Sequence, residues 1–167
     1  MANLCNLDGV VMPETEATVP VLDRGFLFGD SVYEVICTRK GIPFAAVEHL
    51  DRMRLSAAGL GIELDLDDRA ILGRIKQTLA AAGNAESYVR IIVTRGTGTA
   101  PNIDLSYAPG PLRWVFLVRD LASQPGQPSH LAIVPRLRND RRALDPAIKS
   151  GNYLNNVLGL AEAKRRG

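Results

Sequence analysis

Cysteine and histidine are scarce in this chain of 167 residues. It has two cysteines, Cys5 and Cys37, and two histidines, His49 and His130. Two cysteines do not make a disulfide framework, and neither histidine belongs to a zinc-ligand spacing. We therefore expect no metal site.

Long apolar runs and a strong net charge are also absent. No segment is long and apolar enough to cross a bilayer, and the N-terminus lacks the basic start and apolar run of a signal peptide. The formal net charge of +2 is too small to indicate a nucleic-acid or membrane partner. We expect a cytoplasmic protein that binds neither.

The first half of the sequence contains patterns of hairpins and helices. The turns Asp8-Gly9 and Lys40-Gly41 each separate two short apolar stretches and predict β-hairpins. Apolar residues at three- and four-residue steps then predict two helices, the second capped by Asp65 or Asp67 and closed at Gly83. The predicted strands are 5–7, 10–12, 31–39 and 42–45, and the first helix is 47–60.

The second half predicts more strands and a last helix. Short apolar runs bounded by turn residues predict strands at 88–94, 114–118 and 131–134. Residues 96–111 are expected to form a long loop, a linker with Pro and Gly precedes residue 131, and residues 153–166 have a helical pattern. Hairpins, helices, further strands and a helix, in that order, indicate an α+β domain rather than a doubly wound sheet.

One of the four lysines has an unusual setting. Lys40 lies in a predicted turn, and Lys76 and Lys164 lie on helices with polar neighbours. Lys149 instead follows the apolar residues 146–148 and precedes an apolar helix. Burial disfavours the charged form of an amine, and a neutral amine is the form that makes a Schiff base. On this local pattern alone, an ordinary surface lysine is the favoured interpretation.

Residues 148–156, with the sequence IKSGNYLNN, resemble the lysine motif of the class IV aminotransferases. These are the fold-type IV pyridoxal-phosphate enzymes, which include branched-chain and D-amino-acid aminotransferases. Three more stretches match in the same order: 23–34 resemble the N-terminal signature, 48–57 the helix with the phosphate-binding arginine, and 88–90 the substrate-facing strand of the branched-chain type.

The resemblance covers essentially the whole chain and implies a fold-type IV architecture. In this α+β fold, residues 1–120 would form the N-terminal lobe. Residues 121–167 would form a linker and the beginning of a second, cofactor-binding lobe. The family also implies a homodimer, because its active sites assemble near a subunit interface.

The resemblance implies a pyridoxal 5'-phosphate cofactor and three residues that hold it. Lys149 would form the Schiff base and carry the proton from the substrate α-carbon, Arg52 would bind the phosphate bidentately, and Tyr153 would hydrogen-bond the phenolate oxygen. A solvated helix arginine and a tyrosine packed on the helix start are the alternatives for Arg52 and Tyr153.

Four residues match substrate-pocket positions of the branched-chain type: Phe28, Tyr33, Tyr88 and Arg90. Tyr33 has a core position as its alternative. Arg90 lies inside an apolar strand, and a buried arginine needs an anionic partner such as a substrate carboxylate.

The sequence also departs from the family pattern. Phe28 stands where the branched-chain type has a tyrosine, and residues 100–102 replace the arginine and histidine with which D-amino-acid enzymes bind the substrate carboxylate. The spacing from Lys149 to Tyr153 is one residue shorter than in typical branched-chain enzymes. These departures leave the identity of the substrate open.

Family members are longer than this chain, and their second lobe supplies the acid for the pyridine nitrogen. Glu162, the acid that follows Lys149, lies on the next helix and not where the family has that acid. We therefore expect a truncated or cleaved polypeptide, or one recorded only in part.

The expected reaction exchanges an amino group between an amino acid and a 2-oxo acid. An aminodeoxychorismate-lyase-like enzyme of the same fold, or a non-catalytic fragment without cofactor, are the alternatives.

Overall fold

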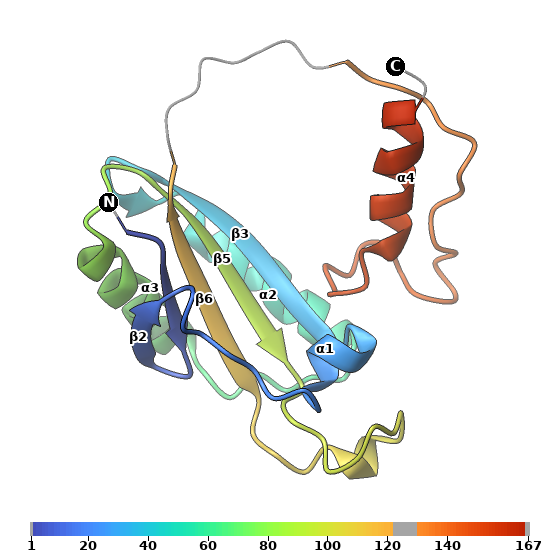
Figure 1. Ribbon diagram of the computed structural model, residues 1–167, viewed down its shortest axis with the longest axis horizontal. Helices are drawn as coiled ribbons and strands as arrows, with labels where there is room; N and C mark the ends of the chain where they lie inside the picture. Colours follow the sequence, from blue (N-terminus) through green and yellow to red (C-terminus); the bar gives the residue numbers. More distant parts are fainter. Residues whose placement is uncertain (1, 122–129, 166–167) are drawn as a thin grey trace.

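The computed structural model describes residues 2–121 and 130–165. Its centre is a six-stranded sheet, antiparallel throughout, with strands in the order β2-β1-β6-β5-β3-β4 (Figure 1). The strands are β1 (Leu4–Leu7), β2 (Val10–Pro13), β3 (Ser31–Arg39), β4 (Ile42–Pro43), β5 (Ser87–Thr94) and β6 (Arg113–Asp120). With helices beside this sheet, the α+β class is confirmed.

The two predicted turns lie where the sequence placed them. Asp8 and Gly9 have φ of 52° and 101°, and Lys40 and Gly41 have φ of 52° and 72°. Positive φ at both central positions gives the twist that joins two antiparallel strands tightly. The second hairpin is shorter than expected: β4 ends at Pro43, and the chain leaves the extended conformation at Ala45, whose φ is 51°.

Two helices cover one face of the sheet (Figure 1). The first is α2 (Ala46–Gly59), and the second is α3 (Asp68–Ala82), capped by Asp67, whose side chain accepts from Ala70 N. Alternate residues of the central strands point toward these helices. The core between them includes Ile36, Leu50, Met53, Ile71, Ile75, Val89, Ile91 and Phe116.

Two elements in the connections were not predicted. Asp23 caps the short helix α1 (Arg24–Phe28), and a single 3-10 turn, η1 (Leu105–Tyr107), interrupts the long loop. The guanidinium of Arg24 is buried, where it donates to Asp30 Oδ2 at 2.9 Å and to the carbonyl oxygen of Asn102 at 2.7 Å. These bonds tie the loop to the N-terminal signature.

The part from residue 130 to residue 165 has little regular structure before α4 (Leu154–Arg165). The predicted strand at 131–134 is wrong: these residues form no strand, and Leu131 and Ile133 are 96% and 97% exposed. Among the described residues no strand lies beside them, and an unpaired strand does not satisfy its backbone groups. The helix prediction is confirmed, except that residue 166 lies outside the described residues.

Part of the predicted linker, residues 122–129, also lies outside the described residues. The division into lobes at residues 1–120 and 121–167 stays a prediction. In the described ranges, no helix has the length and apolar character needed to span a membrane, and no group of side chains suits a metal ion.

Candidate active site

Residues 149–151 lie against the outer edge of β3. The carbonyl oxygen of Lys149 accepts from Tyr33 N at 3.0 Å, and Gly151 N donates to the carbonyl oxygen of Ser31 at 2.8 Å. Lys149 N also donates to Ser56 Oγ on α2 at 3.1 Å. A Cβ at position 151 would clash with Ser31 Oγ and lie 3.1 Å from the carbonyl oxygen of Gly29, so this close approach favours glycine. The lysine motif is thereby fixed to both the sheet and α2.

The side chain of Lys149 points to aromatic rings. Its Nζ lies 3.4 Å from Tyr153 Oη and 4.1 Å from the centroid of the Tyr33 ring. The two rings meet edge to face with centroids 5.3 Å apart. Lys149 is half-buried, and its amine contacts two tyrosines. The spacing of four residues from Lys149 to Tyr153 still brings amine and hydroxyl together.

The two tyrosines differ in their acidity. A hydrogen bond with Tyr33 lowers the pKa of Tyr153, and the bond with Lys149 lowers it further. Burial, followed by the hydrogen bond with Tyr153, raises the pKa of Tyr33. Tyr153 is thus the more acidic hydroxyl, and it is the one beside the amine.

A second cation lies close to the same ring. Arg90 Cζ is 4.1 Å from the centroid of the Tyr33 ring. Arg90 is half-buried on β5, two residues from Tyr88 and on the same face of the strand. Its contact with Tyr33 is a cation–π interaction, and in the described ranges no carboxylate forms an ion pair with it. Tyr33 is both a buried residue and the centre of this cluster.

Arg52 lies on α2, above the other face of β3. Its Nε donates to Glu34 Oε1 at 2.6 Å and its Nη2 donates to Glu34 Oε2 at 2.7 Å. The Arg52 side chain is 53% exposed, whereas that of Glu34 is 0% exposed. The hydrogen bonds to Glu34 raise the pKa of Arg52, with smaller contributions from Tyr153 and Tyr33.

Glu34 and His49 are site residues that the sequence analysis missed. His49 Nδ1 lies 2.8 Å from Glu34 Oε2. Burial raises the pKa of Glu34, but the hydrogen bonds from Arg52 and His49 outweigh it, and the net pKa is lowered. Strand parity is the signal that was available: Glu34 alternates with Val32 and Ile36 on a strand, so an acid falls on the face of the core and needs a cationic partner.

Phe28 lies apart from the lysine cluster at the end of α1. Its ring is 5.1 Å from Arg24 Cζ, and its carbonyl oxygen accepts from Asn152 Nδ2 at 3.3 Å. The structure thus groups Lys149, Tyr153, Tyr33 and Arg90 directly. Arg52 is connected to this group only by its bonds to Glu34, which follows Tyr33 in the chain. Phe28 is connected only by its backbone carbonyl, which accepts from Asn152.

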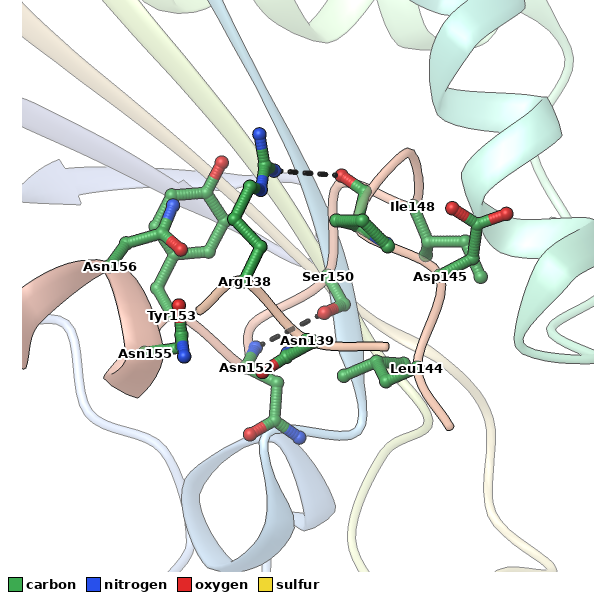
Figure 2. A pocket seen from close by; sticks show the side chains of 11 residues that line it. Arg138, Asn139, Leu144, Asp145, Ile148, Ser150, Asn152, Tyr153, Asn155 and Asn156 are labelled. Atoms are coloured by element: carbon green, nitrogen blue, oxygen red, sulfur yellow. Dashed lines mark hydrogen bonds between the residues drawn. The ribbon is translucent and has the colours of Figure 1, made fainter. Parts of the chain in front are cut away.

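A small pocket lies on the far side of Tyr153, between the loop at 138–148 and the start of α4 (Figure 2). Arg138 lines this pocket and donates from Nη2 to the carbonyl oxygen of Pro146 at 3.4 Å. Its charge is one further cause of the lowered pKa of Tyr153. The other polar side chains in its wall include the amides of Asn139, Asn152, Asn155 and Asn156.

The model of one protein family, amino-transferase class IV, matches residues 31–167. This chain belongs to that family. The class IV assignment agrees with the sequence resemblance.

Two relatives show the range of names within the family. The chain is 34% identical over 163 residues to a Methanocaldococcus jannaschii protein that is provisionally named a branched-chain-amino-acid aminotransferase, covering 96% of this chain and 56% of the relative. It is 30% identical over 151 residues to the D-alanine aminotransferase of Bacillus licheniformis, covering 90% of this chain and 52% of the relative. The chain thus spans about half the length of these relatives.

Solved class IV structures share the fold. A T.th. branched-chain amino acid aminotransferase complexed with N-(5'-phosphopyridoxyl)-L-glutamate is 26% identical, with a TM-score of 0.85 over 99% of this chain and 56% of that chain. The enzyme of Thermoproteus uzoniensis with norvaline is 22% identical, with a TM-score of 0.84 over 98% of this chain and 57% of that chain. The fold-type IV architecture is therefore confirmed.

Proposed function

We propose that this chain binds pyridoxal 5'-phosphate and acts in the exchange of an amino group between an amino acid and a 2-oxo acid, with Lys149 as the catalytic residue. The observation that carries the proposal is the placement of the Lys149 amine, 3.4 Å from the Tyr153 hydroxyl and over the ring of Tyr33. The solved relative with a phosphopyridoxyl-glutamate adduct supports the same chemistry.

The residues present fit the three polar parts of this cofactor. The Lys149 amine is half-buried and open to an aldehyde, and Tyr153 Oη beside it suits a phenolate oxygen. A guanidinium has five N–H donors, and Glu34 takes two of those of Arg52, so three remain for a phosphate. We therefore propose Lys149, Tyr153 and Arg52 as the residues that hold the cofactor.

The bound cofactor supplies an electron sink for the carbanion that forms when the substrate α-carbon loses its proton. The protein's part is to hold groups and to move that proton. Lys149 Nζ accepts the proton from the α-carbon and returns it, as a general base and then a general acid. Tyr153 Oη would donate a hydrogen bond to the phenolate oxygen of the cofactor, and the lowered pKa of Tyr153 strengthens this donation.

The substrate carboxylate would bind on the other side of Tyr33. Arg90 has a planar fork of donors and no acidic partner among the residues described, and Tyr88 lies on the same strand face. We propose these two residues for the carboxylate and Tyr33 and Phe28 for the walls of the substrate pocket. The homodimer remains a prediction from the family resemblance, and the cytoplasmic location remains a prediction from the sequence.

Replacement of Lys149 by alanine tests the proposal. We expect K149A to lose both transamination and the visible absorption band of the bound cofactor, because Lys149 supplies the amine of the cluster. Lys76→Ala, on an exposed turn of α3, is the matched control and should change neither. A K149A protein that keeps its activity and its band would refute the assignment.

An assay of the wild-type protein without an acceptor distinguishes amino transfer from elimination. A transferase without a 2-oxo acid acceptor stops after its first half-reaction, so the amino donor alone should give at most one equivalent of 2-oxo acid per cofactor and no turnover. Steady release of pyruvate without an acceptor would instead favour the lyase of the same fold.

A further inference from the structure

The pair formed by Glu34 and Arg52 has a property that the phosphate site alone does not explain. Glu34 is a fully buried carboxylate, and it binds Arg52 through the edge formed by Nε and Nη2. A negative charge at this position weakens the attraction of Arg52 for a phosphate. On charge alone, a neutral residue at position 34 would therefore let Arg52 bind a phosphate more tightly.

Geometry gives a reason for the carboxylate. A long arginine side chain loses rotamer freedom when it binds a ligand, and anchoring it beforehand removes that cost from the binding step. Two parallel N–H···O bonds fix the plane of the guanidinium as well as its position. With the Nε–Nη2 edge occupied, both donors of Nη1 and one of Nη2 are held in a single orientation.

His49 completes the arrangement from the same helix, three residues before Arg52. Its Nδ1 lies 2.8 Å from Glu34 Oε2 and 3.3 Å from Arg52 Nη2. A carboxylate only accepts and a guanidinium only donates, so the proton belongs on Nδ1, which donates to Glu34. The 3.3 Å approach of Arg52 is then a contact and not a second hydrogen bond.

We propose that Glu34 and His49 are positioning residues that hold the guanidinium of Arg52 so that its Nη1 edge receives the cofactor phosphate. Glu34 binds the opposite edge, and His49 holds Glu34. This inference rests on the proposed function, and it adds one detail to it: because Glu34 binds the Nε–Nη2 edge, the phosphate is left with the donors of the Nη1 edge.

The test compares two cofactor forms that differ only in the phosphate. Dissociation constants for pyridoxal 5'-phosphate and for pyridoxal are measured by absorption titration of the protein. The variants are E34Q, which keeps the size and loses the charge, and E34D, which keeps the charge and shortens the reach. Glu48→Gln, on the exposed face of the same helix as Arg52, is the matched control.

We expect E34Q and E34D each to weaken pyridoxal 5'-phosphate about 10- to 100-fold, the size typical of lost groups that orient a binding residue. Pyridoxal binding should stay as in the wild type, and E48Q should change neither constant. If Glu34 acted only through its charge, E34Q would bind the phosphate form more tightly and E34D would bind it as before. That result, or equal losses for both cofactor forms, would overturn the proposal.

His49 provides a second route if the buried substitutions prevent folding. His49→Leu removes the donor to Glu34, and His49→Asn places an amide N–H close to the position of Nδ1. We expect H49L to weaken the phosphate form selectively and H49N to restore it; no loss in H49L would overturn the inference. A wild-type protein that binds neither cofactor form would refute the proposed function itself.

Discussion

The two described parts of this chain differ in how they are held together. In residues 2–121, six strands and two helices enclose a core with fully buried side chains such as Ile36 and Phe116. In residues 130–165, no residue of α4 is buried, and Leu158, on that helix, is 42% exposed. The second part contacts the first mainly through residues 148–152.

This difference teaches where the candidate site obtains its geometry. Tyr33, Glu34, Arg52 and Arg90 lie on packed elements of the first part, whose positions the core fixes. Lys149 and Tyr153 come from the second part and reach them through short backbone contacts with β3. The site is thus a rigid half joined to a half whose placement depends on a few hydrogen bonds.

The largest expected effect comes from the core of the first part. Phe116→Ala should lower the free energy of unfolding by about 3–5 kcal/mol, because it removes a fully buried aromatic side chain and leaves a cavity. Leu158→Ala, in α4, should cost far less. Chemical denaturation of both variants measures the two values, and equal losses would show that the second part is packed as tightly as the first.

Contact between the two parts is tested at Gly151. Gly151→Ala places a Cβ that clashes with Ser31 Oγ and lies 3.1 Å from the carbonyl oxygen of Gly29. Overpacking of this kind costs about 1–3 kcal/mol, and we expect it to displace residues 149–151 from β3 rather than to unfold the sheet. Affinity for pyridoxal 5'-phosphate should fall about tenfold, while the melting temperature of the first part stays nearly constant.

Gly159→Ala is the matched control for this variant. Within α4 an added Cβ meets only Arg136 Cδ at 3.9 Å, an ordinary contact. Alanine in a helix interior should stabilise α4 by up to about 1 kcal/mol, and it should leave cofactor binding unchanged. If both glycine variants lost affinity alike, the docking of residues 149–151 would not be the cause.

Low pH should destabilise the first part of the chain by protonating Glu34. Its pKa lies below the ordinary value of 4.5, so the ionised form favours the folded state. This contribution is present above pH 4.5 and is lost as the pH falls through the lowered pKa. The difference in melting temperature between wild type and Glu34→Gln should therefore shrink below pH 4.5, as thermal scans across that range can measure. A constant difference would contradict the ion pair.

The sequence predicted those elements whose causes are local. Asp8-Gly9 and Lys40-Gly41 form turns because of their own φ preferences, and the two helices follow from apolar spacing and the Asp67 cap. The absence of the predicted strand at 131–134 does not follow from local causes. The apolar pattern of these residues is real, but a strand needs a neighbour, and the described residues provide none there.

The site divides in the same manner. Lys149, Arg52 and Tyr153 could be named because each lies in a short motif. The function of Glu34 could not be named, although Glu34 stands in the same signature as Tyr33. Its partner Arg52 lies 18 residues away on α2, which packs on the face of β3 that carries Glu34. The pairing needs both the strand parity and the position of α2, and only the second depends on tertiary structure.

The smallest change in the free energy of unfolding is expected at an exposed apolar side chain of the second part. Ile133 is 97% exposed, so its apolar side chain gains almost nothing from burial in this structure. Ile133→Ser should change the free energy of unfolding by less than about 0.5 kcal/mol, as for other surface substitutions. Chemical denaturation of the 167-residue chain provides the measurement. A loss of several kcal/mol would mean that Ile133 is buried in solution, and the contrast between a packed first part and an open second part would then be wrong.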